Sequence, residues 1–287
     1  MIPNKKVLDL MSTDLKTLEI PGNRETLLSA IKEFRLSVFP VIEKDSDNKL
    51  VGMVGRSEIL RKPAETQLAL LMSKISDWPT IKKEQSIVDL IKLMNDMKRS
   101  KIPVIEGDNK IVGLVSISDI IWKIISNDKS FNEEIKENFS DNISVLWEGT
   151  PANVAAQILL HSGQEALPVI NEKGLAGIIS PNDFLKFADV RNFQEISTDA
   201  EVDATETWDS SSVLIISDKI LIIPSRPVIE IMSKNLHTVT VFSNLSSASQ
   251  MFRSKKIDQA PVVDEDDHLL GLLTNWDILG AFIKHIS

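Results

Sequence analysis

The sequence has no cysteine among its 287 residues, and this absence excludes several kinds of site. Without a thiol the chain can form no disulfide, no thiolate zinc site, no iron–sulfur cluster and no cysteine nucleophile. Long hydrophobic runs are also missing, since no window approaches the roughly 18 to 20 apolar residues of a membrane span. The first residues, MIPNKKVLDLMS, lack the continuous apolar stretch of a signal peptide. We therefore expect a cytoplasmic protein without a membrane segment.

Positive charge is scarce relative to negative charge. The chain has 32 lysine and arginine residues against 41 aspartate and glutamate residues, which gives a net charge of -9 at pH 7. A nucleic-acid-binding protein usually needs a basic face that neutralises phosphates, so this charge argues against that class. No P-loop or Gly-x-Ser-x-Gly string occurs, and the four histidines show no paired spacing for a metal. We expect no metal site and no enzyme.

Four segments of the chain can be aligned with one another. Each contains proline followed by valine, a polar turn, a glycine inside an apolar run, and an acidic residue six positions after that glycine. The acidic residues are Glu58, Asp119, Asp183 and Asp277. The four segments are SVFPVIEKDSDNKLVGMVGRSEIL (37–60), SKIPVIEGDNKIVGLVSISDII (100–121), QEALPVINEKGLAGIISPNDFL (164–185) and DQAPVVDEDDHLLGLLTNWDIL (258–279).

A Met-Ser dipeptide opens three of these repeats, in DLMSTD (9–14), LLMSKISD (70–77) and EIMSKN (230–235). Repeat three, near DNISVLWEGTP (141–151), lacks that opening. In repeat two, a short strand at 79–83 precedes a helical pattern over 86–100, with Ser86 as N-cap and Ile87, Leu90, Ile91, Met94 and Met97 on one face.

Two further strands follow in each repeat. The Pro-Val run begins the second strand, where proline is tolerated at the first position, and the glycine-containing run forms the third strand after a turn around Gly107 and Asn109. A second helix starts at the Ser-x-x-Asp string. Each repeat is therefore predicted to be a β-α-β-β-α unit, too small to bury its own sheet, so two repeats should pack together.

The Ser-x-x-Asp string has two interpretations, and both remain open at this stage. In a capping box the hydroxyl accepts a hydrogen bond from the first helical turn, and the acid three residues later returns one. Alternatively, an aspartate at a strand-to-helix turn can bind the two hydroxyls of a ribose. The glycine in the preceding strand allows another backbone or a ligand to approach closely. The two roles are compatible.

Pro-Val in all four repeats, with Met-Ser in three and Gly-x-x-[Ser/Thr]-x-x-Asp in three, all in phase, resembles the cystathionine-β-synthase (CBS) domain family over almost the whole chain. The resemblance implies an α/β (α+β) fold in which repeats one and two form one module, and repeats three and four form another. The clefts between paired repeats bind AMP, ADP, ATP or sometimes S-adenosylmethionine in that family. The predicted limits are 1–66, 67–130, 138–190 and 228–287 for the four repeats, with an insert at 191–227.

The resemblance also assigns the binding residues of each cleft. By that resemblance the aspartate binds the ribose, and the Ser or Thr supports ribose or phosphate. The backbone around the first strand and the Pro-Val dipeptide frames the adenine, and the residue two before the proline contacts phosphate. Only repeat two offers a cation at that position, which weakens the case for a triphosphate in the other clefts, although Arg99 and Arg253 lie nearby on helix ends. The predicted ligand-binding residues are Ser116, Asp119, Lys101, Ile102, Pro103, Ser180, Asp183, Thr274, Asp277, Thr80, Ile81, Thr238 and Val239.

Repeat one departs from this pattern, because Gly55 replaces the hydroxyl and Glu58 is one methylene longer than aspartate. We expect its cleft to be empty or weak, with no more than three filled sites per chain. Between repeats three and four, an acidic stretch (195–212) precedes two apolar runs, VLII (213–216) and ILII (220–223), which predict a β-hairpin buried on both faces. This insert either covers the edge of a module or binds a partner.

The sequence therefore predicts a regulatory sensor rather than an enzyme. Its conformation or its affinity for an unknown effector protein would depend on an adenine nucleotide. A module that binds S-adenosylmethionine, a scaffold with empty clefts and a nucleotide-hydrolysing enzyme are the alternatives. A homodimer is compatible with the sequence, and nucleic acid and membrane are not expected partners.

Overall fold

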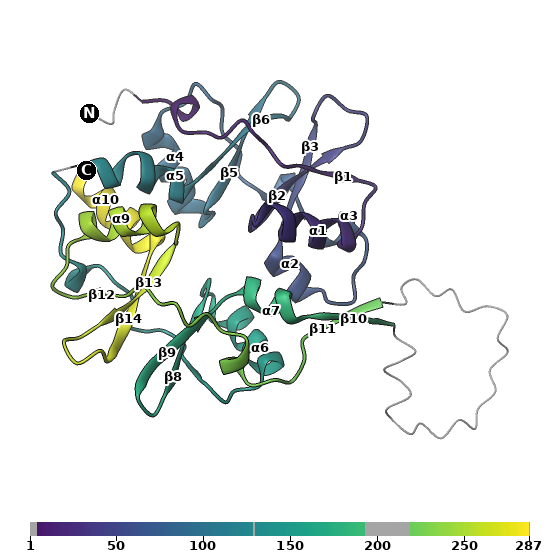
Figure 1. Ribbon diagram of the computed structural model, residues 1–287. Helices are drawn as coiled ribbons and strands as arrows, with labels where there is room; N and C mark the ends of the chain where they lie inside the picture. The colour runs from purple at the N-terminus through teal and green to yellow at the C-terminus, as the bar shows by residue number, and fades with distance from the viewer. Residues whose placement is uncertain (1–4, 129, 193–218, 287) are drawn as a thin grey trace, which may run out of the picture.

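The computed structural model describes residues 5–128, 130–192 and 219–286, which form four repeats around a common centre (Figure 1). Each repeat contributes a first short extended segment, a helix, an antiparallel pair of longer strands and a second helix. This order confirms the predicted β-α-β-β-α unit and the mixed α/β fold class. In repeat two the first segment is reduced to a single bridge at Ile81.

The elements of the first two repeats follow one another with short connections. Repeat one comprises η1 (Val7–Asp9), β1 (Leu18–Ile20), α1 (Arg24–Phe34), β2 (Val38–Glu43), β3 (Leu50–Gly55) and α2 (Arg56–Arg61). Repeat two comprises α3 (Leu68–Leu71), β4 (Ser73–Lys74), η2 (Ile75–Asp77), α4 (Ile87–Met97), β5 (Lys101–Glu106), β6 (Lys110–Ser116), α5 (Ile117–Lys123) and η3 (Ile125–Asn127).

The last two repeats are separated by a strand pair. Repeat three comprises η4 (Ile135–Glu137), β7 (Leu146–Trp147), α6 (Ala152–Ser162), β8 (Leu167–Asn171), β9 (Gly174–Ile179) and α7 (Pro181–Phe187). The strand pair is β10 (Asp189–Asn192) and β11 (Lys219–Ile222). Repeat four comprises η5 (Val228–Glu230), β12 (Val239–Thr240), α9 (Leu245–Lys255), β13 (Gln259–Val263), β14 (Leu269–Thr274) and α10 (Asn275–Ile286).

Helix α4 shows how the sequence sets a helix in this fold. The Ser86 hydroxyl accepts a hydrogen bond from the Asp89 N–H at 3.1 Å, which confirms Ser86 as the N-cap. The predicted apolar face is buried at Ile87, Leu90, Ile91 and Met94. The prediction is wrong for Met97, which is 50% exposed, because the helix ends there and Lys98 adopts a left-handed conformation.

The two long strands of every repeat pair with the same irregularity. The register shifts directly after the valine of the Pro-Val dipeptide in all four antiparallel pairs. The proline was expected at the first strand position, but Pro103 is the third residue of β5. It fits there because its pairing neighbour Leu114 exchanges backbone hydrogen bonds with Ser12 on the other side of β6.

The opening segment of each repeat packs against the other repeat of its module. Met11 of repeat one lies against Gly113 of repeat two, and Met72 of repeat two lies against Gly52 of repeat one. Likewise Met232 of repeat four lies against Gly177 of repeat three. This exchange explains the glycine in the third strand, since a larger residue would collide with the incoming side chain.

Repeat three lacks Met-Ser, as its sequence shows, but it still has an opening segment. Phe139 lies against Gly271 of repeat four, and Ser140 forms an antiparallel bridge with Leu272. Ser12 pairs with Leu114 in the same way. Phenylalanine thus replaces methionine, which hid the opening from a search for Met-Ser.

The two modules meet through their helices. Helix α5 of repeat two packs against α9 and α10 of repeat four, and α2 of repeat one packs against α6 and α7 of repeat three. Repeats two and four share one large core, in which Ile120, Phe252 and Phe282 are fully buried. Figure 1 shows α5 beside α9 and α10 on the left of the view, and α2 beside α7 to the right of them.

One strand of the predicted hairpin is present among the described residues. Strand β11, which contains most of the ILII run, pairs antiparallel with β10 directly after α7. The VLII run lies outside the described residues, as does the acidic stretch. Leu221 is buried in the core of repeat one, and its N–H donates to the Pro63 carbonyl at 2.9 Å. The strand pair therefore covers part of repeat one, while its neighbours Ile220 and Ile222 are only half-buried.

Across the described ranges, none of the helices combines the length and apolar character needed to span a bilayer.

Candidate functional site

The Ser-x-x-Asp strings form capping boxes at the start of the second helix. In repeat two, the Ser116 N–H and hydroxyl donate to Oδ2 of Asp119 at 2.9 and 2.6 Å, and the Asp119 N–H donates back to the Ser116 oxygen at 3.2 Å. Thr274 and Asp277 repeat this arrangement in α10, with hydrogen bonds of 2.7 and 2.6 Å to Oδ2. The capping interpretation is therefore confirmed.

The second carboxylate oxygen of each aspartate also has a partner. Oδ1 of Asp119 lies 2.9 Å from Nζ of Lys123, which in turn donates to the Leu10 carbonyl. Oδ1 of Asp277 accepts a hydrogen bond from the Ser140 hydroxyl at 3.2 Å. Leu10 and Ser140 belong to the opening segments of the partner repeats. Each aspartate thus lies where its repeat meets the other repeat of the module.

Repeat three keeps the same motif in a more enclosed setting. The Ser180 N–H and hydroxyl donate to Oδ2 of Asp183 at 2.9 and 2.8 Å, and Lys186 lies 3.2 Å from Oδ1. The Asp183 side chain is only 11% exposed, compared with 21% for Asp119. Lys186 thus occupies Oδ1 of Asp183 as Lys123 occupies Oδ1 of Asp119.

Repeat one retains only the backbone part of the capping box. The Gly55 N–H donates to Oε2 of Glu58 at 2.9 Å, and glycine supplies no hydroxyl. The expectation that this repeat keeps a helix start without the hydroxyl–aspartate pair agrees with this geometry.

The predicted adenine-framing residues of repeat two come together through backbone hydrogen bonds. The Ile81 N–H donates to the Pro103 carbonyl at 3.1 Å, and the Ile105 N–H donates to the Ile81 carbonyl at 2.9 Å. Ile81, Ile102 and Pro103 are buried, and Thr80 is half-buried. In repeat four, Val239 is buried and pairs with Val262, while Thr238 is exposed. These side chains mostly fill the core, so their backbone is what remains for a ligand.

An aspartate missed by the sequence analysis connects two of the motifs across the modules. Oδ1 of Asp258 accepts hydrogen bonds from the Ser118 hydroxyl at 2.7 Å and from Nδ2 of Asn275 at 2.8 Å. Ser118 directly precedes Asp119, and Asn275 directly follows Thr274. The signal in the sequence is positional, because Asp258 stands three residues before Pro261, as Glu165 stands three residues before Pro168.

A second acidic residue, Glu165, interacts electrostatically with Asp258. Glu165 keeps an exposed surface, yet desolvation by the surrounding protein raises its pKa, with Asp258 adding to the rise and Lys101 opposing it. Lys101, the predicted phosphate contact, therefore interacts electrostatically with Glu165. Of the two nearby arginines, Arg99 stacks 4.2 Å from the ring centroid of Trp78. Arg253 donates to Oδ1 of Asn127 at 3.0 Å.

Arg56 supplies positive charge at the contact between repeats one and three. Its Nη2 donates to the Arg35 carbonyl at 3.0 Å, and burial lowers its pKa while Asp183 raises it. The negative charge of Asp183, in the other module, therefore offsets part of the cost of burying the positive charge of Arg56. Arg56 thus supplies a positive charge that acts on Asp183, whereas Ala166, two residues before Pro168, supplies none.

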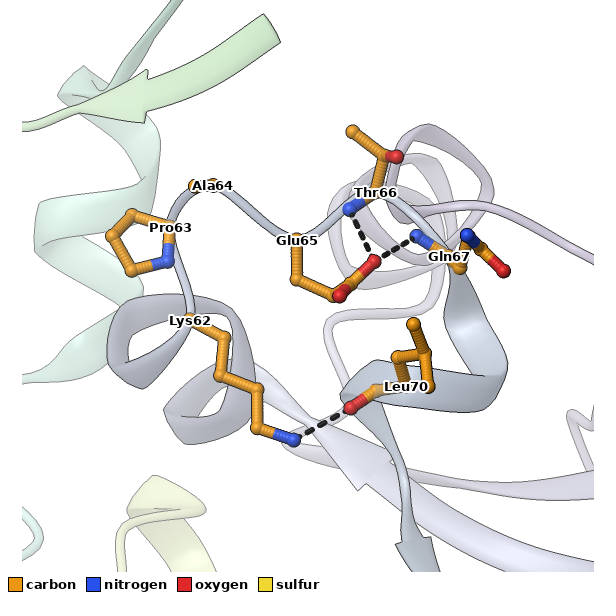
Figure 2. Close-up of a pocket in the computed structure, with 7 residues that line it drawn as sticks. All are labelled: Lys62, Pro63, Ala64, Glu65, Thr66, Gln67 and Leu70. Carbon is orange, nitrogen blue, oxygen red and sulfur yellow. Dashed lines mark hydrogen bonds between the residues drawn. The ribbon is translucent and has the colours of Figure 1, made fainter. Parts of the chain in front are cut away.

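A surface pocket of about 450 Å³ lies elsewhere, at the turn after α2. Figure 2 shows that Lys62 donates to the Leu70 carbonyl and that Glu65 accepts from the Thr66 and Gln67 N–H groups. The pocket contains none of the predicted ligand-binding residues. Among the described residues, no group of three or more histidine, aspartate and glutamate side chains has a metal-binding arrangement.

Comparison with known proteins supports the four-repeat architecture. MJ1225 of Methanocaldococcus jannaschii is 22% identical over 203 residues, which cover 71% of this chain and 66% of that protein. Its crystal structure, whose description proposes an archaeal homologue of g-AMPK, has a TM-score of 0.79 at 19% identity and covers 97% of this chain and 100% of that one. A conserved protein from Pyrococcus horikoshii has a TM-score of 0.62 at 24% identity and covers 96% of this chain and 99% of that one.

A further relative matches over a shorter region. MJ0188 of Methanocaldococcus jannaschii is 28% identical over 116 residues, which cover 40% of this chain and 43% of that protein. The chain thus spans less than two thirds of the length of these curated relatives, and the structural likenesses show the fold. The family model described as CBS domain matches residues 7–65, 70–126, 134–189 and 228–284. The match covers more than half of the chain, which therefore belongs to the CBS domain family.

Proposed function

We propose that the protein is a cytoplasmic regulator that binds an adenosine ligand between paired CBS repeats and thereby changes its affinity for an effector protein. The single observation that carries this proposal is the repeated hydroxyl–aspartate pair. Three of four repeats present a carboxylate at a strand-to-helix turn, and in repeats two and four it lies beside the opening segment of the partner repeat. A carboxylate in such a position can accept hydrogen bonds from both hydroxyls of a ribose. We assign no catalytic role to the protein.

Ligand binding would be detected through stability. Any ligand that binds the native state alone raises the free energy of unfolding by mass action, about 2.7 kcal/mol at a ligand concentration of 100 times Kd. We expect at least one of AMP, ADP, ATP and S-adenosylmethionine to raise the unfolding temperature of the full chain. Unchanged melting curves with all four ligands at millimolar concentration would contradict the proposal. Incubation with ATP should leave ATP intact, and hydrolysis would favour the enzyme alternative.

A structural scaffold is the second candidate, and one observation favours it. Each of the three aspartates already has hydrogen-bond or ion-pair partners on both oxygens. A scaffold needs no ligand to satisfy its capping boxes, so calorimetric titration with the same four compounds distinguishes the two functions. Heat of binding supports the regulator, and its absence supports the scaffold.

A further inference from the structure

Asp258 is hydrogen-bonded to residues next to two predicted ligand motifs, those of repeats two and four. Its side chain accepts hydrogen bonds from Ser118 in the first turn of α5 and from Asn275 in the first turn of α10. Its carbonyl also accepts the Asn275 N–H at 2.9 Å. Asp119 and Asp277 are one and two residues further along these helices. A ligand held by either aspartate would therefore lie near the carboxylate of Asp258.

Glu165 adds a second negative group to the same region. It interacts electrostatically with Asp258 and with Lys101, and both Glu165 and Asp258 keep exposed surface. Each stands three residues before the proline of its repeat, where repeats one and two carry Ser37 and Ser100. The second module thus places carboxylates where the first module places neutral hydroxyls.

The charge balance around a bound ligand follows from these positions. At the Asp119 site two lysines, Lys101 near Glu165 and Lys123 paired with Asp119, stand against three carboxylates. At the Asp277 site the carboxylate is contacted by the neutral Ser140 hydroxyl, so Lys123 does not compensate it there. A 5′ phosphate carries a charge of about -1.5 to -2 at pH 7, so it would meet net repulsion here. A neutral 5′ group meets no such repulsion, and a sulfonium group would be attracted.

From this arrangement we propose that Asp258 and Glu165 determine ligand charge, so that the sites at Asp119 and Asp277 select adenosine compounds whose 5′ group carries no negative charge. The proposal rests on the proposed function, because it concerns the ligand of the same sites. The chemical class comprises adenosine, 5′-thioethers of adenosine and the corresponding sulfonium compounds. AMP, ADP and ATP bind more weakly in proportion to their charge.

A titration series on the full chain tests this selection. 5′-Methylthioadenosine and AMP share the adenosine group and differ in 5′ charge, and isothermal calorimetry gives Kd for each. We expect 5′-methylthioadenosine to bind at least about tenfold more tightly than AMP, which corresponds to about 1.4 kcal/mol. AMP or ATP binding as tightly as 5′-methylthioadenosine would overturn the proposal while leaving the proposed function intact.

Two variants locate the effect. Asp258→Asn keeps an oxygen that can accept hydrogen bonds from Ser118 and Asn275 but removes the negative charge. Glu165→Gln removes the negative charge of Glu165 and keeps a side chain of similar size and shape. Each should tighten AMP binding several-fold and change Kd for 5′-methylthioadenosine by less than about twofold. Asp266→Asn is the matched control, since it removes one exposed aspartate from the turn at the other end of β13.

The outcomes distinguish a failure of the charge selection from a failure of the proposed function. An unchanged ratio of the two Kd values in both variants would contradict the role of Asp258 and Glu165, even if wild-type protein prefers the neutral ligand. The wild-type ligand series needs no variant and so remains informative if a variant fails to fold. If no adenosine compound binds wild-type protein, the proposed function fails, and the charge selection fails with it.

Discussion

The main-chain carbonyl of Ser140 lies so close to Gly271 that a Cβ atom on residue 271 would overlap it. Phe139 closes the same space with its ring edge, 2.7 Å from that Cβ position. Ser140 opens repeat three and Gly271 lies in the third strand of repeat four. The glycine therefore exists for the contact between two repeats, and its exchange should weaken the module.

The first prediction concerns this contact. Gly271→Ala should lower the free energy of unfolding by about 1–3 kcal/mol, because inserting a methyl group into a packed contact forces backbone or side-chain shifts. Urea denaturation measures the change. Gly280→Ala in α10 is the control, since nothing lies within 4 Å of its Cβ position, and it should be neutral or stabilising by up to about 1 kcal/mol. Equal losses in both variants would contradict this account.

The second prediction separates capping from ligand binding. Asp277→Ala should cost about 1 kcal/mol of stability as a lost cap and also weaken binding of the adenosine ligand by about 10- to 150-fold. Asp89→Ala is the matched control, because Ser86 and Asp89 form the same capping box on α4 and belong to none of the predicted ligand-binding residues. It should lose stability alone. Calorimetry together with thermal denaturation gives both quantities.

The third prediction concerns stoichiometry. Repeat one offers Glu58 without a hydroxyl, so its cleft should be empty or weak, and no more than three sites per chain should fill. Glu58→Ala should leave the number of sites unchanged, whereas Asp119→Ala should remove one. Loss of a tight site in Glu58→Ala, with Asp119→Ala silent, would reverse the assignment. The number of sites comes from calorimetric titration at protein concentrations well above Kd.

The repeat unit was predictable because its signals are local. Proline-valine, the turn at Gly107 and Asn109 and the capping boxes each act over a few residues, and both turn residues adopt positive φ as the turn requires. Three of the four opening segments were recognised from Met-Ser. The fourth was missed because packing against Gly271 needs a large apolar side chain, which phenylalanine supplies as well as methionine.

Contacts between the modules were not predictable in the same way. Asp258 joins Ser118 and Asn275 only because α5 and α10 pack together, and no short sequence pattern records that packing. The pairing of β11 with β10 was not predicted for a similar reason, because the two strands lie far apart in the sequence. Roles of individual site residues remain predictions.

The fourth prediction tests how the strand pair is attached to repeat one. Arg24 is fully buried, and its Nη1 donates to the Pro63 carbonyl at 2.6 Å while Nη2 donates to the Lys219 carbonyl at 3.4 Å. Arg24→Met should lower the free energy of unfolding by about 1.5–3 kcal/mol through the loss of hydrogen bonds from a charged group. Arg61→Met, at the exposed end of α2, should have little effect. Similar urea midpoints for the two variants would contradict a fastening role for Arg24.

The fifth prediction concerns the pH dependence of stability. The pKa of Glu165 is raised from its ordinary value of 4.5 by desolvation and by Asp258. The folded state therefore holds the proton more tightly than the unfolded state, and the stability that this provides is lost as pH rises through the raised pKa. Glu165→Gln resembles the protonated acid at every pH. Its advantage over wild-type protein should be absent below pH 4.5 and grow above it, as measured by urea denaturation across pH.

Two charged neighbours of Glu165 should shift this pH dependence in opposite directions. Asp258→Asn removes a charge that raises the pKa, so the loss of stability attributable to Glu165 should shrink. Lys101→Met removes a charge that lowers the pKa, so the same loss should grow and extend to higher pH. Glu172→Gln, in the exposed turn after β8, serves as the control and should leave the pH profile unchanged. If Asp258→Asn and Lys101→Met shift the profile in the same direction, the two charges do not act on Glu165 as the structure indicates.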